Sequence, residues 1–335
     1  MIYYRVIALL FLSLSVSCSS VSSYKIINKE GFEEGQEIKE QSKFLVSSIA
    51  NASRKLHDIA WPIMISNLDS CQNSKINAFG LMIAHLEDIP SSLAPSFYAA
   101  SPINSLINSK ADLPMIVSVA KDSPADRAKI IEGDLIISIN NSIVSYKNYK
   151  RLLDDAAQKG SLKIRIKRLE EEITYELESE LICGYPVQAM ISPIPNAYAD
   201  GSKIYITIAT LDFVKDDQEI AFLIAHELAH NIHHYKGEAL YESQGNPLAI
   251  EEKPSLQKIT DLLIFQTEEK ETEADLYGVE FAIKAGIAQD KVANYFRRLT
   301  IYMPQLMKNS FFRMHPGNAK RVADIERKLK ELNSN

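Results

Sequence analysis

The sequence has little of several features that would define its class at once. Among 335 residues there are three cysteines, twelve glycines and one tryptophan, and acidic residues outnumber basic ones by 43 to 37. Three cysteines are too few for a disulfide-rich scaffold or for a zinc knuckle built from cysteine alone. A net negative chain without a basic stripe also argues against a nucleic-acid partner. With 46% apolar residues, the chain can instead bury the cores of more than one domain.

The N-terminus has the pattern of a secretory signal. Arg5 precedes an apolar run over 6–12, and small residues follow up to Cys18. We expect 1–17 to be a signal peptide and Cys18, which ends a segment that resembles a bacterial lipobox, to be lipidated. The alternatives are an ordinary signal peptide or an anchor helix, but the run is shorter than the roughly 20 residues that cross a bilayer. The sequence predicts a lipid-anchored protein of the bacterial cell envelope, and Ser19 favours the outer membrane, facing the periplasm.

Four segments follow the signal peptide. The first is a polar tether after the lipidated residue, and the second has apolar residues at helical spacing, so that it can pack on a later domain. The third alternates short β-rich runs with turns, and the fourth is mostly helical after one strand. These segments cover 18–35, 36–75, 76–183 and 184–335. We expect the helix of the second segment to end at Trp61-Pro62, and the fold class to be α+β.

The third segment contains the phrase DSPADRAKIIEGDLIISIN over 122–140. Together with its order of strands and helices, this phrase resembles a PDZ domain of the bacterial periplasmic-protease type. The resemblance implies a small β-rich domain that adds an extended peptide to a sheet edge. Lys129 and Asn141 stand where such domains usually have glycine, so we expect an altered backbone there.

Gly80, Leu81 and Met82 are the candidate loop of this domain for the carboxylate of a C-terminal peptide. The alternative is that these residues only begin a strand, and that the domain is a structural insertion. In an oxidising compartment, Cys71 and Cys183, which flank the domain, can form a disulfide that joins its two ends. The alternative is two buried free thiols.

A capped apolar helix carries the chemistry of the fourth segment. Asp216 begins it, Glu219 completes a capping box, and Gly237 ends it. Within it, His226-Glu227-Leu228-Ala229-His230 places two imidazoles one turn apart, where both can bind one zinc ion. Glu227 lies beside the first ligand, where its carboxylate can take a proton from a zinc-bound water.

A second helix supplies the third ligand. Glu271 and Asp275 are four residues apart and share a face, whereas Glu273 points to roughly the opposite side. We expect Glu271 to bind the metal and Asp275 to accept the second imidazole N–H of a ligand histidine. Two histidines and one carboxylate with an open fourth position are the hydrolytic form of a zinc site. The alternative, extra ligands at His233 and His234, is weaker because two histidines already occupy the face.

HELAH followed by ETEAD, with Asn196-Ala197 and the strand 203–211 before them, resembles metallopeptidase family 48. That family is gluzincin-like and includes HtpX-type, CAAX prenyl and periplasmic quality-control proteases. The resemblance implies one zinc ion held by His226, His230 and Glu271, with Glu227 as the general base.

The later phrase His315-Pro316 with Arg321 resembles the family's HPxxxxR. It implies that His315 approaches the metal, that Arg321 supports the site, and that either can steady the oxyanion; the alternative for His315 is a place at a helix cap. We expect extended polypeptides to bind along 203–211.

The expected function is that of a zinc-dependent endopeptidase that degrades misfolded or unassembled envelope proteins, with a PDZ domain for peptide recognition or regulation. The alternative is a non-hydrolytic chaperone or assembly lipoprotein with a structural zinc site. Intact Glu227 argues against it, because binding alone requires no base. His57 and His85 have no partners in sequence and are interpreted as structural.

Overall fold

The computed structural model describes residues 32–72, 74–89, 113–235, 267–302, 304 and 318–334. The expected signal peptide, Cys18, Gly237 and His315 lie outside these ranges. Contacts divide the chain into two compact units, 1–41 and 42–335, and the first contributes only the start of the first described helix. Among the described residues, no helix combines the length and the apolar character needed to cross a bilayer.

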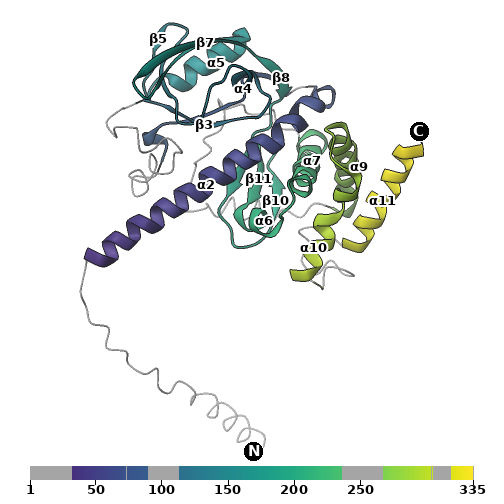
Figure 1. Ribbon diagram of the computed structural model, residues 1–335. Coiled ribbons are helices and arrows are strands. Elements are labelled where there is room, and N and C mark those ends of the chain that lie inside the picture. Colours follow the sequence, from purple (N-terminus) through teal and green to yellow (C-terminus); the bar gives the residue numbers. More distant parts are fainter. Residues whose placement is uncertain are drawn as a thin grey trace, which may run out of the picture. The chain divides into compact units, whose positions relative to one another are not determined.

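Helix α2 (Phe32–Ser66) runs without a break through Trp61-Pro62 (Figure 1). The expected end of the helix at that dipeptide is therefore wrong. Pro62 is exposed, whereas Trp61 and Ile63 on either side of it are buried. The proline ring removes one backbone hydrogen bond on the solvent side, where water can bind the released carbonyl, and burial of its neighbours holds the helix in place.

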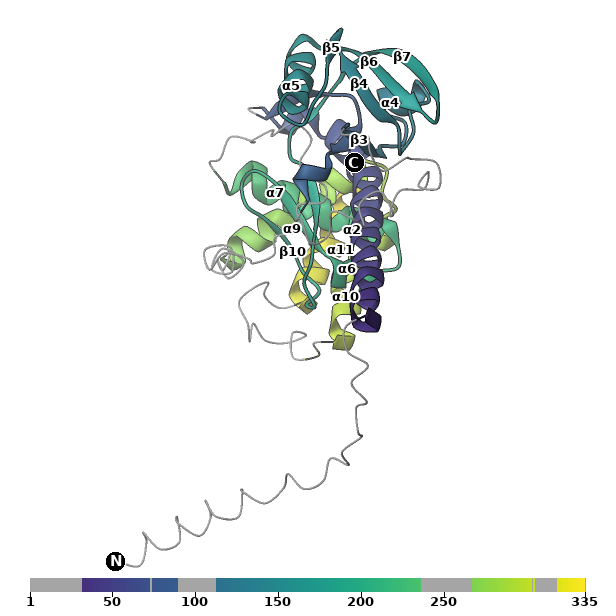
Figure 2. The same ribbon diagram turned by 90° about the vertical axis from the view of Figure 1, so that its left-hand side faces the viewer.

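The PDZ-like region is a six-stranded antiparallel sheet. Its strands run in the order β2-β3-β4-β6-β7, and β5 pairs with β4. The bounds are β2 (Leu81–Ala84), β3 (Met115–Val119), β4 (Leu135–Ile139), β5 (Ser142–Ile143), β6 (Ser161–Arg168) and β7 (Glu171–Glu178). Helix α5 (Tyr149–Lys159) packs on β4 and β6 (Figure 2). The short β-rich runs expected of this segment are thus present as strands.

The two faces of β2 enter different cores. Leu81 and Ile83 point into the cluster under α5, whereas Met82 and Ala84 join Val46 and other residues of α2 on the opposite face. This division follows from the alternation of side chains along a strand. The later half of α2, including Leu56, belongs to a third cluster together with the helices of the fourth segment.

The turns of this region keep the left-handed backbone that glycine would favour. Lys129 has φ 66° and Asn141 has φ 66°, so the expected alteration of the backbone at these positions is wrong. Gly80 has φ 74°, and an added Cβ would lie 2.1 Å from Cβ of Ser123, which caps α4 (Pro124–Arg127). Gly80 therefore has a packing reason to be glycine that is independent of peptide binding.

The two ends of the region meet. Strand β1 (Lys75–Ala78) pairs with β8 (Glu180–Cys183), and a disulfide joins Cys71 to Cys183 with their Cα atoms 5.6 Å apart. The expected pairing of these two cysteines is the one that the structure has. The disulfide therefore holds the two ends of the PDZ-like region together by a covalent bond, in addition to the pairing of β1 with β8.

The fourth segment contains a three-stranded sheet in the order β10-β11-β9. The bounds are β9 (Val187–Met190), β10 (Ala197–Ala199) and β11 (Ile204–Thr207). The single strand expected over 203–211 is therefore too long, and two other strands were missed. Thr207 ends β11 because its hydroxyl accepts a hydrogen bond from the backbone N–H of Thr210 and caps α6 (Ile208–Phe213).

Most of the other described residues of this segment are helical. The helices are α7 (Asp217–His233), α9 (Glu268–Lys284), α10 (Asn294–Tyr302) and α11 (Asn318–Ser334), with the short 3-10 turn η5 (Gln289–Lys291) between α9 and α10. Two further 3-10 turns, η1 (Leu68–Ser70) and η2 (Leu86–Asp88), lie earlier in the chain. Helix α9 packs against both α7 and α11 (Figure 1). Gly278 permits the close approach of α9 to α7, because an added Cβ would lie 3.0 Å from Cα of His226.

Candidate metal centre

Helix α7 is fixed at its start by capping and along its length by burial. Asp216 is the N-cap, and its Oδ1 accepts the backbone N–H of Gln218 at 3.0 Å. Glu219 does not complete the expected capping box; its carboxylate instead receives Arg298 at 2.7 and 3.0 Å. The helix ends at His233 rather than just before Gly237. All residues of α7 from Glu219 to Asn231 are buried, so the motif His226 to His230 lies in the core.

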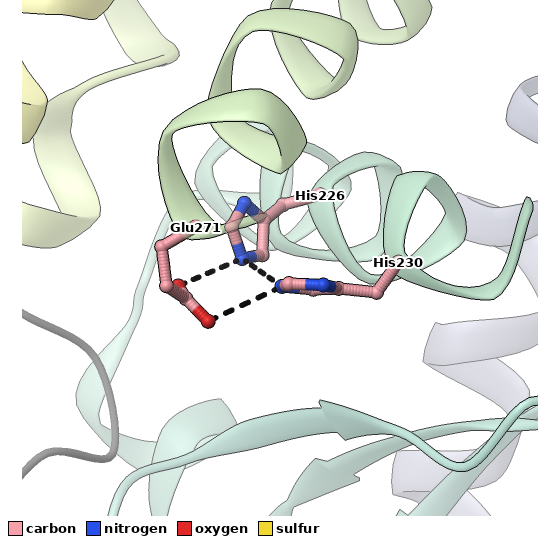
Figure 3. A group of neighbouring side chains, drawn as sticks. All are labelled: His226, His230 and Glu271. Atoms are coloured by element: carbon pink, nitrogen blue, oxygen red, sulfur yellow. Dashed lines mark hydrogen bonds and ion pairs between the residues drawn. The ribbon is translucent and has the colours of Figure 1, made fainter. Parts of the chain in front are cut away.

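His226 and His230 from α7 and Glu271 from α9 point toward one another (Figure 3). The two Nε2 atoms are 3.1 Å apart, and the oxygens of Glu271 lie 3.6 Å from Nε2 of His226 and 3.4 Å from Nε2 of His230. All three side chains are buried. The three residues expected to bind the metal are thus brought together from two helices and about 40 residues of intervening chain.

These separations fit a tetrahedral zinc ion. Ligands at about 2.0–2.1 Å from zinc lie about 3.3–3.4 Å from one another in a tetrahedron. The two Nε2 atoms lie 3.1 Å apart, and each has an oxygen of Glu271 at a similar distance, Oε1 at 3.4 Å from His230 and Oε2 at 3.6 Å from His226, so the donors gather at about this spacing. Two imidazoles and one carboxylate are also the donor types that zinc prefers, and three protein ligands leave a fourth position for water or substrate.

Asp275 and Arg321 support His226 from the buried side. Asp275 Oδ1 lies 3.0 Å from Nδ1 of His226, and Arg321 donates to both oxygens of Asp275 at 2.6 and 2.7 Å. Burial by itself lowers the pKa of His226, but Asp275 and Glu271 outweigh it and raise that pKa to about 9. Burial raises the pKa of Asp275, but Arg321 and His226 together more than compensate, so this pKa lies below its usual range. The expected place of Asp275 next to a ligand histidine agrees with this arrangement.

The guanidinium of Arg321 contacts other residues of the site on several sides. Its Nη1 lies 3.2 Å from Oε2 of Glu271, its guanidinium lies 4.1 Å from the ring centre of Phe296, and its side chain is 4% exposed. A guanidinium that already bridges two carboxylates has little freedom to turn toward a substrate. These contacts favour the supporting role of Arg321 over the oxyanion role.

His230 is supported by residues that the sequence did not suggest. Its Nδ1 lies 2.8 Å from Nδ1 of His234, and Nε2 of His234 lies 3.1 Å from Oε2 of Glu273. Glu273 is exposed, as expected, but its carboxylate reaches back to the site through His234. His233 stacks on Tyr277 with ring centres 3.9 Å apart, away from the ligands. Neither His233 nor His234 belongs to the group of ligand atoms.

Glu227 is buried next to His226 in the sequence and 2% exposed. Burial raises the pKa of Tyr295; the cation of Arg321 opposes this rise and the charge of Glu227 adds to it. Tyr295 therefore lies within electrostatic reach of Glu227 and Arg321, on a helix in which no site residue was expected. A buried carboxylate next to a ligand histidine in the sequence remains the candidate general base.

Asn231, the residue after the second ligand, ties the small sheet to α7. Its buried amide accepts the backbone N–H of Gly201 at 2.7 Å and donates to the carbonyl of Lys203 at 3.1 Å. Both partners lie in the turn between β10 and β11, so Asn231 holds that hairpin against the helix. Strand β11 is paired on both sides, whereas β10 is an edge of the sheet and contacts α7. Strand β11 thus lies between two other strands, and the expected path of the substrate along 203–211 stays a prediction.

The remaining candidates are placed as follows. His315 lies outside the described residues. Gly80 precedes β2, which is an edge strand of the six-stranded sheet and carries Leu81 and Met82. His57 lies 2.9 Å from the hydroxyl of Ser118, and the side chain of His85 caps η2, so both have the structural roles expected of them.

The model of peptidase family M48 matches residues 156–252 and 253–329, which is more than half of the chain. The chain belongs to peptidase family M48. Its metal-ligand triad and buried Glu227 lie within the matched segments, and this membership makes the protein a metallopeptidase. A PDZ-domain model matches residues 115–168, so this M48 metallopeptidase carries a PDZ domain.

No curated protein matches the M48 metallopeptidase. Among solved structures, it is similar to the HtrA3 PDZ domain bound to a phage-derived ligand. That match has 21% sequence identity and a TM-score of 0.25, and it covers 33% of this chain and 92% of the other.

Proposed function

We propose that this M48 metallopeptidase is a zinc-dependent endopeptidase that hydrolyses peptide bonds of misfolded or unassembled proteins in the bacterial cell envelope. The observation that carries the proposal is the triangle of His226, His230 and Glu271, whose separations fit zinc with one position open. When bound, zinc would polarise the scissile carbonyl and lower the pKa of its water. Glu227 would take the proton from that water and pass it to the leaving amine.

The three-stranded sheet beside α7 is the proposed place for the substrate backbone. An extended polypeptide can pair with an edge strand through main-chain hydrogen bonds, which require no particular side-chain sequence. The contact of β10 with α7, held by Asn231, would bring the paired backbone next to the ligands. Such pairing suits substrates that are unfolded, because only an unfolded segment offers a free strand.

The lipid anchor and the PDZ domain complete the proposal. Cys18 would hold the enzyme on the outer membrane, facing the periplasm, and 18–35 would act as a tether. A C-terminal peptide would add to the edge of β2 near Gly80, for substrate recognition or for regulation. An oxidising compartment of this kind would allow the disulfide between Cys71 and Cys183 to form and persist.

The decisive experiment is the Glu227→Gln variant. Wild type and variant are purified, their zinc content is measured, and each is incubated with an unfolded envelope protein with and without a chelator. We expect both proteins to hold one zinc ion, and only the wild type to cleave. Glu269→Gln on the exposed start of α9 is the matched control and should cleave like the wild type.

Undiminished cleavage by Glu227→Gln contradicts the proposal. Zinc binding by both proteins without cleavage by either, also in the presence of bacterial membranes, would instead favour the non-hydrolytic chaperone. If the wild type cleaves and Glu227→Gln does not, the envelope proteomes of cells that carry each form are compared. Proteins that accumulate with the variant are the candidate substrates.

A further inference from the structure

Two polar side chains beside the metal centre, His234 and Glu273, have no part in the proposed mechanism. His226, His230 and His234 follow one another at four-residue intervals along α7 and its C-cap, so the three imidazoles form a single stripe. Neighbouring rings in the stripe have centres 4.7 and 4.9 Å apart. The first two rings face Glu271, whereas the third turns toward Glu273 at the surface.

We propose that His234 and Glu273 are positioning residues for zinc, which orient His230 through a chain of hydrogen bonds. The chain runs from Nδ1 of His230 to Nδ1 of His234 over 2.8 Å and from Nε2 of His234 to Oε2 of Glu273 over 3.1 Å. The inference rests on the proposed function, because it assigns to His230 the role of a zinc ligand.

The proton positions along this chain follow from the metal-binding nitrogen. If Nε2 of His230 faces the metal, its ring proton is on Nδ1, which then donates to the lone pair of Nδ1 of His234. That places the proton of His234 on Nε2, from which it donates to the carboxylate of Glu273. Each of the two hydrogen bonds thus has one donor and one acceptor with both imidazoles neutral. Glu273 fixes the tautomer of His234, and His234 fixes the ring orientation of His230.

The exposure of the two residues suits this role. The side chain of His234 is 4% exposed, whereas that of Glu273 is 51% exposed. A buried imidazole requires a hydrogen-bond partner, and His234 has one on each side. The stripe therefore links a buried metal ligand to the protein surface over the length of two side chains.

The test measures zinc affinity rather than activity. Metal-free full-length protein is titrated with zinc in competition with a chromophoric chelator. We expect His234→Phe, which keeps the ring bulk but removes both hydrogen bonds, to lower the affinity about 10- to 100-fold. His234→Gln, whose amide can accept from His230 and donate to Glu273, should retain most of the affinity. The visible spectrum of the cobalt-loaded protein should change in His234→Phe, because the field of its ligands changes.

A double-mutant cycle separates positioning from a merely structural role. Glu273→Leu should weaken zinc binding several-fold by itself, but it should add nothing in the His234→Phe background, because Glu273 acts only through His234. Glu269→Leu, on the same helix and also exposed, is the matched control and should bind zinc like the wild type.

Two results would overturn the inference. One is an unchanged zinc affinity and cobalt spectrum in His234→Phe, and the other is full additivity of the two substitutions. If wild type itself bound no zinc, the proposed function would fail. If wild type bound zinc and cleaved substrate but His234→Phe behaved identically, only the positioning role would fail.

Discussion

The two ligand histidines lie one turn apart on α7, yet their surroundings differ. His226 contacts Asp275, which in turn binds Arg321; Asp275 and Arg321 are buried and are called the buried arm. His230 contacts His234, which in turn contacts Glu273 at the surface; His234 and Glu273 are called the exposed arm. The buried arm holds α7, α9 and α11 together, whereas the exposed arm only connects α7 to α9. One metal site thus combines contacts that stabilise the fold with contacts that orient a ligand.

The largest effect is expected from the buried arm. Arg321→Met leaves the carboxylates of Glu271 and Asp275 buried without their cation, so the metal-free protein should lose about 3–5 kcal/mol in its free energy of unfolding. Denaturant unfolding in the presence of a chelator measures this loss. Arg297→Met, which removes an exposed ion pair with Glu326 in α11, is the control and should cost less than about 1 kcal/mol. Equal losses in the two variants would contradict the stabilising role of the buried arm.

The pH dependence of the metal-free protein tests the same arm. The pKa of His226 is about 9 when folded and has its ordinary value of 6.5 when unfolded, so the folded state holds the proton more tightly. The stabilisation by charged His226 is therefore complete below pH 6.5 and is lost as the pH rises through 9. We expect a decrease on the order of 2–3 kcal/mol across this window.

Unfolding of the metal-free protein at a series of pH values between 6 and 10 measures this decrease. Asp275→Asn should flatten the profile, because the first carboxylate that raises the pKa of His226 is gone. A wild-type profile that is already flat in this window would contradict the buried arm as described.

The close contact between the two ligand helices gives the next effect. In Gly278→Ala the new methyl group would lie 3.0 Å from Cα of His226 and 3.2 Å from its backbone nitrogen, so α9 must shift. We expect a loss of about 1–3 kcal/mol in stability, together with weaker zinc binding. Gly35→Ala has open space around the new methyl group and is the matched control. If both variants unfolded at the same denaturant concentration, the contact would not position α9.

The smallest effect is expected from the exposed arm. Glu273→Gln should change the unfolding free energy of the metal-free protein by less than about 0.5 kcal/mol, because its carboxylate is half exposed and screened by water. Denaturant unfolding of the variant beside wild type checks this value. A loss comparable to that of Arg321→Met would show that both arms carry stability.

The sequence was sufficient for the buried arm and insufficient for the exposed one. Glu271 and Asp275 are four residues apart on α9, which ends at Lys284, and this spacing alone puts both on one face of the helix. His234 and Glu273 belong to different helices, and Glu273 lies on the far face of its own. Only the packing of α9 on α7 brings their side chains to 3.1 Å, and no pattern within either helix encodes that distance.

The fold shows the same division between local and long-range information. Most strands and helices of the PDZ domain could be predicted, because each is bounded by turn residues such as those at Gly133 and Gly160. The short strands β9 and β10 and the continuity of α2 through Pro62 could not. They depend on burial against other parts of the chain, which overrides the local preference of a few residues.

The most direct test of the central claim is a crystal structure of the zinc-loaded protein with anomalous diffraction at the zinc edge. We predict one peak per chain, about 2.0–2.2 Å from Nε2 of His226, Nε2 of His230 and a carboxylate oxygen of Glu271. Asp275 and His234 should remain next to the outer nitrogens of the two histidines. A peak bound by His233 or His234, or by no residue of α9, would contradict the site.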